Sequence, residues 1–304
     1  MKWRKLGHVW RPAGDRRWAR THAYVPTPTV HDDDIRVYVA CLDGERIGRL
    51  AYVDVDRRDP RRVLRVASAP ALDLGESGAF DEIGVSPSCV LDVEGERWLY
   101  YMGWQRAPRL PYLIFAGAAR ELRDGTFERV SRTPLLGPTA DEPCIRSAIT
   151  ILPGSTGYRG WYVSATAWIA VAGRTLPTYV IRSATSPDGR VWTVLPGMAI
   201  GHESRDEFGL GRPWVIRDPA LHRMWYSIRS VSAPYRIGYA ESRDGGTSWI
   251  RKDTESGIER SSDGWDSEMI CFPAIIDVDG RRFLFYNGNG HGATGFGVAE
   301  LESG

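Results

Sequence analysis

The chain has 304 residues, of which 42% are hydrophobic and 25% are charged. This is the composition of an ordinary globular protein, and it excludes a disordered chain, a collagen-like chain and a small disulfide scaffold. The 39 lysines and arginines balance the 38 aspartates and glutamates. Without a positive field the charge favours neither a nucleic acid nor a membrane surface as partner, so we expect a small-molecule ligand.

The N-terminal residues carry charge but no apolar run, so no secretory signal is expected. The longest apolar stretch without charge, residues 160–173, is shorter than the about 20 residues that a membrane-spanning helix needs. We therefore predict a cytoplasmic protein.

A repeated pattern organises the chain from one end to the other. A polar loop, a short apolar strand, a turn and an aromatic strand recur in this order. The phase of the repeat is placed at Pro28, Pro87, Ser147, Pro213 and Pro273. The separations are 59, 60, 66 and 60 residues, so five such units account for the length.

Each unit is predicted to hold several strands. The second strand is aromatic and apolar, as suits half-buried strands, and is expected at residues 36–42, 97–104, 160–168, 223–228 and 282–286. The third strand is expected at residues 46–48, 112–115, 178–181, 236–239 and 295–298. A fourth strand follows at residues 62–66, 127–130, 191–195 and 248–251.

The fifth unit stops one strand short at Leu301, while a spare strand from Trp3 to Trp10 precedes the first unit. The expected fold is all-β: a five-bladed β-propeller with four-stranded antiparallel blades, whose last blade is completed by the N-terminal strand. One domain spans residues 1–304. Its blades are placed at about residues 24–75, 83–136, 144–201, 209–260, and 269–301 together with 2–12.

Two segments carry a turn signature. Residues 242–249 have the S-x-D-x-G-x-x-W spacing of the Asp-box of sialidase-like propellers, and residues 186–192 form a version that is one residue shorter. The aspartate caps a tight hairpin, glycine supplies a positive φ and tryptophan packs under the turn. We predict that both turns are structural and lie opposite the ligand-binding face.

With these features the sequence resembles the five-bladed propellers of glycoside hydrolases, in the broad grouping of families 43, 32 and 130, and the glucosyl-hydrolase-like proteins of sugar biosynthesis clusters. The resemblance is carried by residues 224–227, 235–242, 264–267 and 286–290. It implies a carbohydrate-active enzyme that acts on a glycoside or a sugar-derived metabolite by acid–base catalysis in the central pocket.

The sequence departs from the hydrolase pattern at two places. Residues 25–28 and 211–213 lack the carboxylates that families 43 and 32 carry there. Two alternatives therefore stay open: a carbohydrate-binding propeller without catalysis, and a biosynthetic lyase or isomerase that uses His22 as its base.

The loops that lead into the first strands supply the candidate catalytic groups, one in each unit: His22, Glu82, Glu142, Glu207 and Glu268. Crowded carboxylates raise one another's pKa, and glycoside hydrolysis needs such an acid beside an ionised partner. Alternatively, these carboxylates are solvated or paired with arginines, and the repeat is structural.

A second group of residues suits sugar recognition, because aromatic faces stack on sugar rings while amides and guanidinium groups bond to hydroxyls. Arg146 and Arg212 would point toward the channel, where a buried arginine needs an anion. That anion is either a nearby glutamate or a phosphate or carboxylate of the ligand. The candidate substrate-binding residues are Trp104, Arg146, Trp168, Arg212, Arg229, Asp266, Asn287 and His291.

A divalent metal ion in the central channel is a possible cofactor, since His22 with neighbouring glutamates offers nitrogen and oxygen ligands. No HExxH motif or histidine pair defines such a site. The sequence predicts no oligomeric state.

Overall fold

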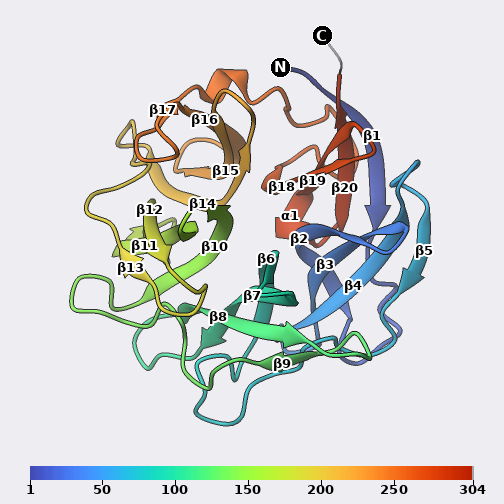
Figure 1. Cartoon of the computed structure of the whole chain (residues 1–304), viewed down its shortest axis with the longest axis horizontal. Coiled ribbons are helices and arrows are strands. Elements are labelled where there is room, and N and C mark those ends of the chain that lie inside the picture. The colour runs from blue at the N-terminus through green and yellow to red at the C-terminus, as the bar shows by residue number, and fades with distance from the viewer. Residues whose placement is uncertain (303–304) are drawn as a thin grey trace.

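The computed structural model describes residues 1–302, and within this range nearly all regular structure is β-strand (Figure 1). The helical elements of this range are the 3-10 turn η1 (Asp253–Glu255) and the short α1 (Asn289–Gly292), in agreement with the predicted all-β class. Neither described helix has the length and apolar character needed to cross a lipid bilayer.

The strands form consecutive antiparallel series that start near the centre of the molecule and end at its rim (Figure 1). The first is β2 (Thr21–His31), β3 (Asp34–Leu42), β4 (Gly48–Asp56) and β5 (Val63–Val66). The second is β6 (Val85–Val93), β7 (Glu96–Gln105), β8 (Leu113–Glu121) and β9 (Phe127–Arg129). The third is β10 (Ile145–Gly154), β11 (Gly157–Val171), β12 (Arg174–Ser186) and β13 (Thr193–Val194).

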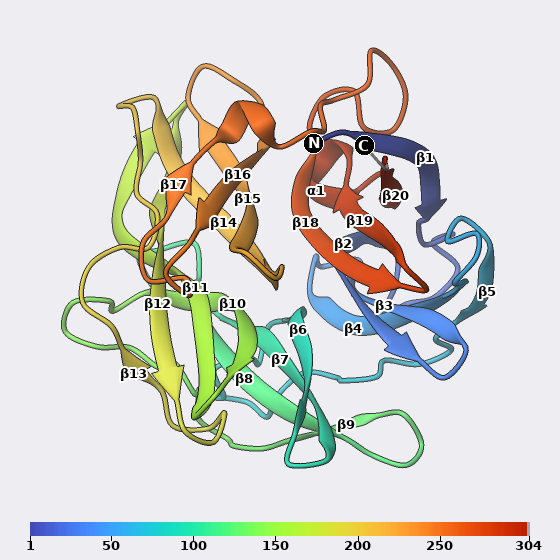
Figure 2. The same ribbon diagram turned by 45° about the horizontal axis from the view of Figure 1, so that its top comes forward.

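The fourth series is β14 (Glu207–Arg217), β15 (His222–Ser230), β16 (Arg236–Ser242) and β17 (Ile250–Arg251). The last comprises β18 (Cys271–Val278), β19 (Arg281–Asn287), β20 (Phe296–Leu301) and, at its outer edge, β1 (Trp3–Trp10). As predicted, the N-terminal strand completes this sheet: Trp3 lies opposite Leu301, and Trp10 lies opposite Phe296. Figure 2 shows β1 beside β20 at this edge.

The first strands of the series surround the centre of the molecule (Figure 1). Each first strand contacts the next one, in the order β2, β6, β10, β14 and β18, and β18 contacts β2 again. Short parallel pairings of β8 with β10 and of β12 with β14 also join the second, third and fourth series into one 12-stranded sheet. The centre is therefore enclosed by strands from every series.

Cross-strand pairs define the repeat. In each series an aromatic residue of the second strand lies opposite an equivalent first-strand residue: Tyr38 and Thr27, Tyr100 and Cys89, Trp161 and Thr150, Trp225 and Trp214, Phe285 and Ala274. All five aromatic side chains are buried, as the aromatic second strands predicted. This buried position anchors each series in the core.

A β-bulge interrupts every first strand just before this pair, at Val25, Pro87, Ala148, Arg212 and Phe272. The predicted phase is correct at Pro87, one residue off in the last three units and three residues off at Pro28. Proline misled the alignment because it is tolerated at several positions of a bulged strand and marks none of them uniquely.

The third strand of the first unit was also misplaced. Residues 46 and 47 lie in a turn, and β4 begins at Gly48. The Asp43 carboxylate accepts hydrogen bonds from the backbone N–H groups of Glu45 (2.9 Å) and Ile47 (3.0 Å), which closes this turn. Arg46 has a left-handed backbone there, with φ of 64°.

The segment 242–249 forms a turn held by Asp244. Its carboxylate accepts hydrogen bonds from the N–H groups of Thr247 (3.0 Å) and Ser248 (2.9 Å). The Trp249 indole donates to the Gly246 carbonyl at 3.1 Å, and Trp161 of the preceding series donates to the same oxygen at 3.2 Å. The turn therefore links the third and fourth series through hydrogen bonds to one carbonyl oxygen.

Candidate functional site

A cavity of about 710 Å³ lies where the bulged ends of the first strands meet. Its wall includes four bulge residues, Val25, Ala148, Arg212 and Phe272, with φ between 51° and 55°. Such a left-handed backbone is uncommon outside glycine, and bulges are frequent beside active sites. Loops between second and third strands supply much of the remaining wall, so the cavity opens on the predicted face.

Six basic residues of the described chain line the wall. They are four arginines and two histidines: Arg46, Arg174, Arg212, Arg229, His22 and His291. No aspartate or glutamate of residues 1–302 lines this cavity. Aromatic side chains fill much of the remaining wall, namely Tyr24, Trp104, Tyr112, Tyr179, Tyr235 and Phe272. An occupant therefore meets a cationic and aromatic surface.

Arg212 is 2% exposed and lies deep in this wall. Its Nη2 donates to the Thr27 hydroxyl (2.8 Å) and to the Pro26 carbonyl (3.3 Å). Its Nε and Nη1 have no hydrogen-bond partner among the described residues. Burial lowers the pKa of Arg212 to about 9, so the side chain remains positively charged at neutral pH.

Arg229 is held by aromatic rings. Its guanidinium lies 4.7 Å from the ring centre of Phe208, 5.1 Å from that of Tyr179 and 5.3 Å from that of Tyr235. Its Nη1 donates to the Tyr179 hydroxyl, whereas its Nε has no partner within residues 1–302. Burial opposes the charge, but the surrounding tyrosines, Tyr179 first, raise the pKa of Arg229.

His22 of β2 and His291 of α1 are neutral imidazoles at neutral pH. Burial, followed by the charge of Arg46, lowers the pKa of His22. Burial, followed by the charge of Arg229, lowers the pKa of His291 to about 4. A neutral imidazole is the form that accepts a proton in acid–base catalysis.

The two predicted stacking tryptophans differ in position. Trp104 lines the cavity, and its indole N–H donates to the Ser86 hydroxyl at 3.1 Å. Its ring lies 5.0 Å from the Tyr112 ring, which in turn lies 5.7 Å from the Trp168 ring. Trp168 therefore supports the wall through Tyr112 and lies outside the lining.

Glu142 and Arg146 lie outside the cavity wall and pair with each other. Arg146 Nε is 3.2 Å from a Glu142 carboxylate oxygen, and Arg182 is 3.4 Å from the same oxygen. The Tyr162 hydroxyl donates to Glu142 at 3.0 Å. For Arg146 the anion is therefore the neighbouring glutamate, whereas Arg212 has none.

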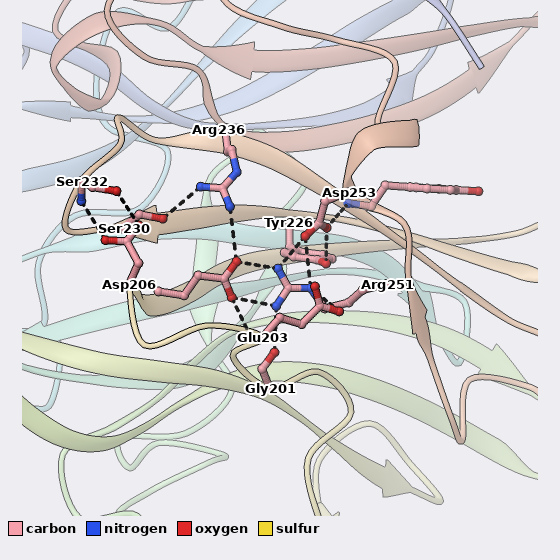
Figure 3. A network of polar contacts seen from close by, with 11 residues as sticks. Gly201, Glu203, Asp206, Tyr226, Ser230, Ser232, Arg236, Arg251 and Asp253 are labelled. Atoms are coloured by element: carbon pink, nitrogen blue, oxygen red, sulfur yellow. Dashed lines mark hydrogen bonds and ion pairs between the residues drawn. The ribbon is translucent and has the colours of Figure 1, made fainter.

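Glu207, the first residue of β14, belongs to a polar network with Arg236, Arg251 and Asp253. Figure 3 shows the Arg236, Arg251 and Asp253 side chains of this network. Arg251 donates to both Glu207 oxygens at 2.8 Å. Burial would raise the pKa of Glu207, but the hydrogen bonds from Arg251 and from the Glu203 N–H, together with the charges of Arg251 and Arg236, outweigh it and lower the pKa. The raised pKa expected of crowded carboxylates is therefore wrong for this residue.

Glu82 and Glu268 also lie away from the wall. The Glu82 carboxylate accepts a hydrogen bond from the Gly78 N–H at 2.7 Å. The Glu268 side chain is exposed, and its backbone N–H donates to Asn289 at 2.8 Å. The structure thus brings His22 to the cavity and leaves the four predicted glutamates outside its lining.

The strand register explains this division. Six residues before each bulge position stand Ala19, Asp81, Glu142, Asp206 and Asp266. Three of these carboxylates accept a hydrogen bond from a second-strand tyrosine, in the pairs Tyr101–Asp81 (2.9 Å), Tyr162–Glu142 (3.0 Å) and Tyr286–Asp266 (2.9 Å). Each also binds a cation, respectively Arg129, Arg146 and Lys5. We call these sets the carboxylate clusters.

His22 does not occupy the equivalent position. It stands three residues before the bulge at Val25, whereas the clustered carboxylates stand six residues before theirs. Sequence alignment on Pro28 placed His22 and the glutamates at one level. The structure separates them, because the first strand carries His22 onward to the cavity.

Asn287 and Asp266 bind residues of neighbouring strands. Asp266 contacts Tyr286 of β19 and Lys5 of β1. The Asn287 side chain accepts from the Val25 N–H (2.8 Å) and donates to the carbonyls of Ala23 (2.7 Å) and Gly295 (2.9 Å). It therefore ties β19 to β2. The predicted substrate-binding residues that reach the wall are Trp104, Arg212, Arg229 and His291; those that do not are Arg146, Trp168, Asp266 and Asn287.

Several wall residues were not predicted from the sequence, among them Arg46, Tyr112, Arg174, Tyr179 and Tyr235. The three tyrosines had a signal, since each follows a proline within two residues, and Tyr112 and Tyr235 directly precede the third strands β8 and β16. The two arginines lie at tips of loops, where the sequence gives no direction to the side chain.

Among the described residues, no group of three or more His, Cys, Asp and Glu side chains is placed to hold a metal ion. His22 and His291 supply two nitrogen donors to the wall, without a carboxylate beside them. A metal ion in the channel therefore stays a prediction.

Comparisons with known proteins place this geometry in context. No family model matches the sequence. Uncharacterized protein Rv1502 of Mycobacterium tuberculosis strain H37Rv is 36% identical over 304 residues, which cover 100% of both chains. Uncharacterized protein MT1551 of strain CDC 1551 shows the same identity and coverage, 36% and 100%.

Solved structures share the fold at low sequence identity. A BT0996 complex with RGII superposes with a TM-score of 0.75 at 17% identity, over 98% of this chain and 90% of that one. A glycoside hydrolase gives 0.74 at 18% identity, with the same coverages of 98% and 90%. A thermostable family-43 glycoside hydrolase gives 0.69 at 15% identity, over 93% and 91%. The fold is therefore a glycoside hydrolase-like β-propeller.

Proposed function

We propose that this chain, which belongs to the same family as the mycobacterial protein Rv1502, is a carbohydrate-active enzyme that works by acid–base catalysis in its central cavity. The glycoside hydrolase-like fold supports a carbohydrate substrate. The observation that carries the proposal is the cavity wall itself, which combines aromatic rings with two neutral imidazoles.

The aromatic part of the wall suits a sugar ring. Trp104 and Tyr112 lie edge to face on one side of the cavity, where they offer apolar surface to the C–H face of a sugar. Tyr24 and Tyr235 stay protonated because burial raises the pKa of both, so their hydroxyls can donate to sugar oxygens. Binding and orientation of the substrate come from these rings.

The catalytic groups in this proposal are His22 and His291. Both imidazoles are neutral at neutral pH, so each can take a proton from the substrate and return it from the resulting imidazolium, without a net proton change. Hydrolysis by paired carboxylates needs two acids on the wall, and the described wall offers none. A lyase or isomerase reaction on a sugar-derived metabolite therefore fits better than ordinary glycoside hydrolysis.

The strand series are, in this proposal, the five blades of a closed propeller. The contacts of β18 with β2 and the pairing of β1 with β20 support closure between the last blade and the first. The glutamates at positions 142 and 207 then stabilise their own blades through arginine partners, and none of the four predicted glutamates touches the substrate.

The test is turnover followed by proton NMR in D2O with a panel of aryl glycosides, sugars, sugar phosphates and sugar acids. This readout detects hydrolysis, elimination, isomerisation and exchange of a carbon-bound proton in one measurement. For a substrate found this way, the His22→Ala and His291→Ala variants should each lose about 10²-fold or more in kcat.

His31→Ala is the matched control, because His31 lies on the same strand β2 at the end away from the cavity. It should keep the wild-type kcat. Full activity of both cavity variants would refute the catalytic assignment.

Carbohydrate binding without turnover is the second candidate function. The absence of carboxylates from the described wall favours it, since it removes the usual hydrolytic groups. Calorimetric binding of a panel member with an unchanged NMR spectrum would establish this function in place of catalysis.

A further inference from the structure

We propose that Arg212 and Arg229 form an anion-binding subsite, so that the ligand is a sugar derivative bearing a phosphate or carboxylate group. The carbohydrate part of this inference rests on the proposed function. The anionic part rests on the charges of the cavity wall.

The charges of Arg212 and Arg229 are not balanced by carboxylates of the described chain. Buried arginines elsewhere have carboxylate partners: Arg36 lies 2.7 Å from Asp54, and Arg251 lies 2.8 Å from Glu207. Within residues 1–302, neither Arg212 nor Arg229 has a carboxylate within ion-pair distance. Two positive charges on one cavity wall therefore lack a counter-charge from the protein.

Both arginines are buried. Arg212 is 2% exposed and Arg229 is 8% exposed, so water can compensate little of either charge. Three of their nitrogen atoms, Nε of both and Nη1 of Arg212, have no hydrogen-bond partner in the described chain. An unpaired buried charge is costly unless an anion neutralises it. A ligand anion in the cavity would supply the missing charge.

Two further arginines add positive charge to the exposed part of the cavity wall. Arg46 and Arg174 are exposed wall residues, and neither forms an ion pair with a described carboxylate. With the two buried arginines they make a basic path into the cavity, which would steer an anion inward. Burial, and then the charges of Arg229, Arg174 and Arg46, lower the pKa of His291 on the same wall.

The chemistry of the subsite suits an oxyanion. Guanidinium groups bind carboxylate and phosphate oxygens through parallel N–H donors. The Tyr179 hydroxyl accepts a hydrogen bond from Arg229, which places a further polar group beside the guanidinium. Planar carboxylates and tetrahedral phosphates both match this donor set, and binding measurements separate them.

The experiment is isothermal titration calorimetry of the full chain at constant ionic strength with glucose, glucose 6-phosphate, glucuronate and inorganic phosphate. At least one anionic sugar should bind about tenfold or more tightly than glucose, as expected for charge-assisted hydrogen bonds. A preference for glucose 6-phosphate identifies a phosphate site, and a preference for glucuronate identifies a carboxylate site.

Arg212→Gln and Arg229→Gln should each weaken that binding by about tenfold or more. Arg243→Gln is the matched control, because Arg243 is exposed in the turn after β16, whose other end approaches the cavity. It removes the same charge and should leave Kd unchanged. If Arg212→Gln does not fold, Arg229→Gln and the salt dependence of wild-type binding decide the question.

Equal binding of glucose and both anionic sugars would overturn the subsite, and so would wild-type affinity in both cavity variants. These readouts do not depend on turnover. Anion-selective binding with no reaction in the NMR assay would retain the subsite and refute the catalytic proposal. Turnover of a neutral sugar with no anion preference would do the reverse.

Discussion

Arg251 and Arg212 are both buried arginines, yet their surroundings are opposite. Arg251 lies within ion-pair distance of Glu203, Glu207 and Asp253. Arg212 has hydrogen bonds to Thr27 and Pro26 but no carboxylate partner in the described chain. The charge of Arg251 is therefore neutralised within the protein and stabilises the fold. The charge of Arg212 is not neutralised by a described carboxylate and faces the cavity.

The same contrast governs the neighbouring titratable groups. Hydrogen bonds from Arg251 offset the burial of Glu207 and lower the pKa of that carboxyl. At the cavity, burial and arginine charge act in the same direction on His291 and lower its pKa to about 4. Arginine thus keeps carboxylates ionised in the outer network and keeps imidazoles neutral in the cavity.

The largest effect is expected when the outer network is broken. Arg251→Met leaves Glu207 buried with the partly exposed Arg236 as its remaining cationic partner, so the free energy of unfolding should fall by about 3–5 kcal/mol. Urea denaturation measures this change. The control Arg236→Met removes a side chain that is 43% exposed and should cost less than about 1 kcal/mol. Equal costs would contradict a central role for Arg251.

The next effect is a pH dependence of stability from the cavity. Between its ordinary value of 6.5 and the folded value of about 4, His291 binds a proton in the unfolded chain but not in the folded one. Stability should therefore fall as the pH falls through this window, by roughly 3 kcal/mol in total from this residue. His291→Asn should remove that part of the dependence in urea titrations on either side of the window.

The carboxylate of Glu207 acts at lower pH. Its lowered pKa contributes stability that is present above the ordinary carboxyl value of 4.5 and is lost as the pH falls toward the folded pKa. The His291→Asn variant is compared with the wild type between pH 6.5 and 4.5, above the range in which Glu207 titrates. An equally steep loss of stability in both proteins would contradict the assignment of this pH dependence to His291.

A smaller effect distinguishes a structural from a catalytic carboxylate. Glu142→Gln should lower the free energy of unfolding by about 2 kcal/mol, because Arg146 and Arg182 lose their counter-charge. Once a substrate is known, kcat of the folded protein should not change. Glu268→Gln, at an exposed side chain, should change neither quantity. A large loss of kcat in Glu142→Gln would restore its predicted catalytic role.

The smallest effect has the opposite sign. Arg212→Met removes a buried charge that has no described counter-charge, so without ligand the free energy of unfolding should rise by about 1 kcal/mol. Urea denaturation in phosphate-free buffer measures the change. A destabilisation as large as that of Arg251→Met would show that both arginines serve the fold.

Much of the fold followed from local patterns. Aromatic and apolar runs at regular intervals predicted the second strands, because strands that are buried along most of their length appear in the sequence as short continuous apolar runs bounded by turns. The spare strand at residues 3–10 predicted the pairing with β20, since an incomplete sheet leaves unpaired backbone groups that another strand satisfies. The face that carries the cavity was also predicted correctly.

The membership of the site did not follow from local patterns. A bulge adds one residue to a strand and changes which side chains point to the centre, and no residue type marks that position uniquely. Ion pairs across long separations, such as Arg251 with Glu207, then decide which charges are satisfied. Sequence spacing therefore identified Arg146 and Arg212 as buried arginines, but only the three-dimensional packing gave Glu142 to Arg146 and left Arg212 unpaired at the cavity.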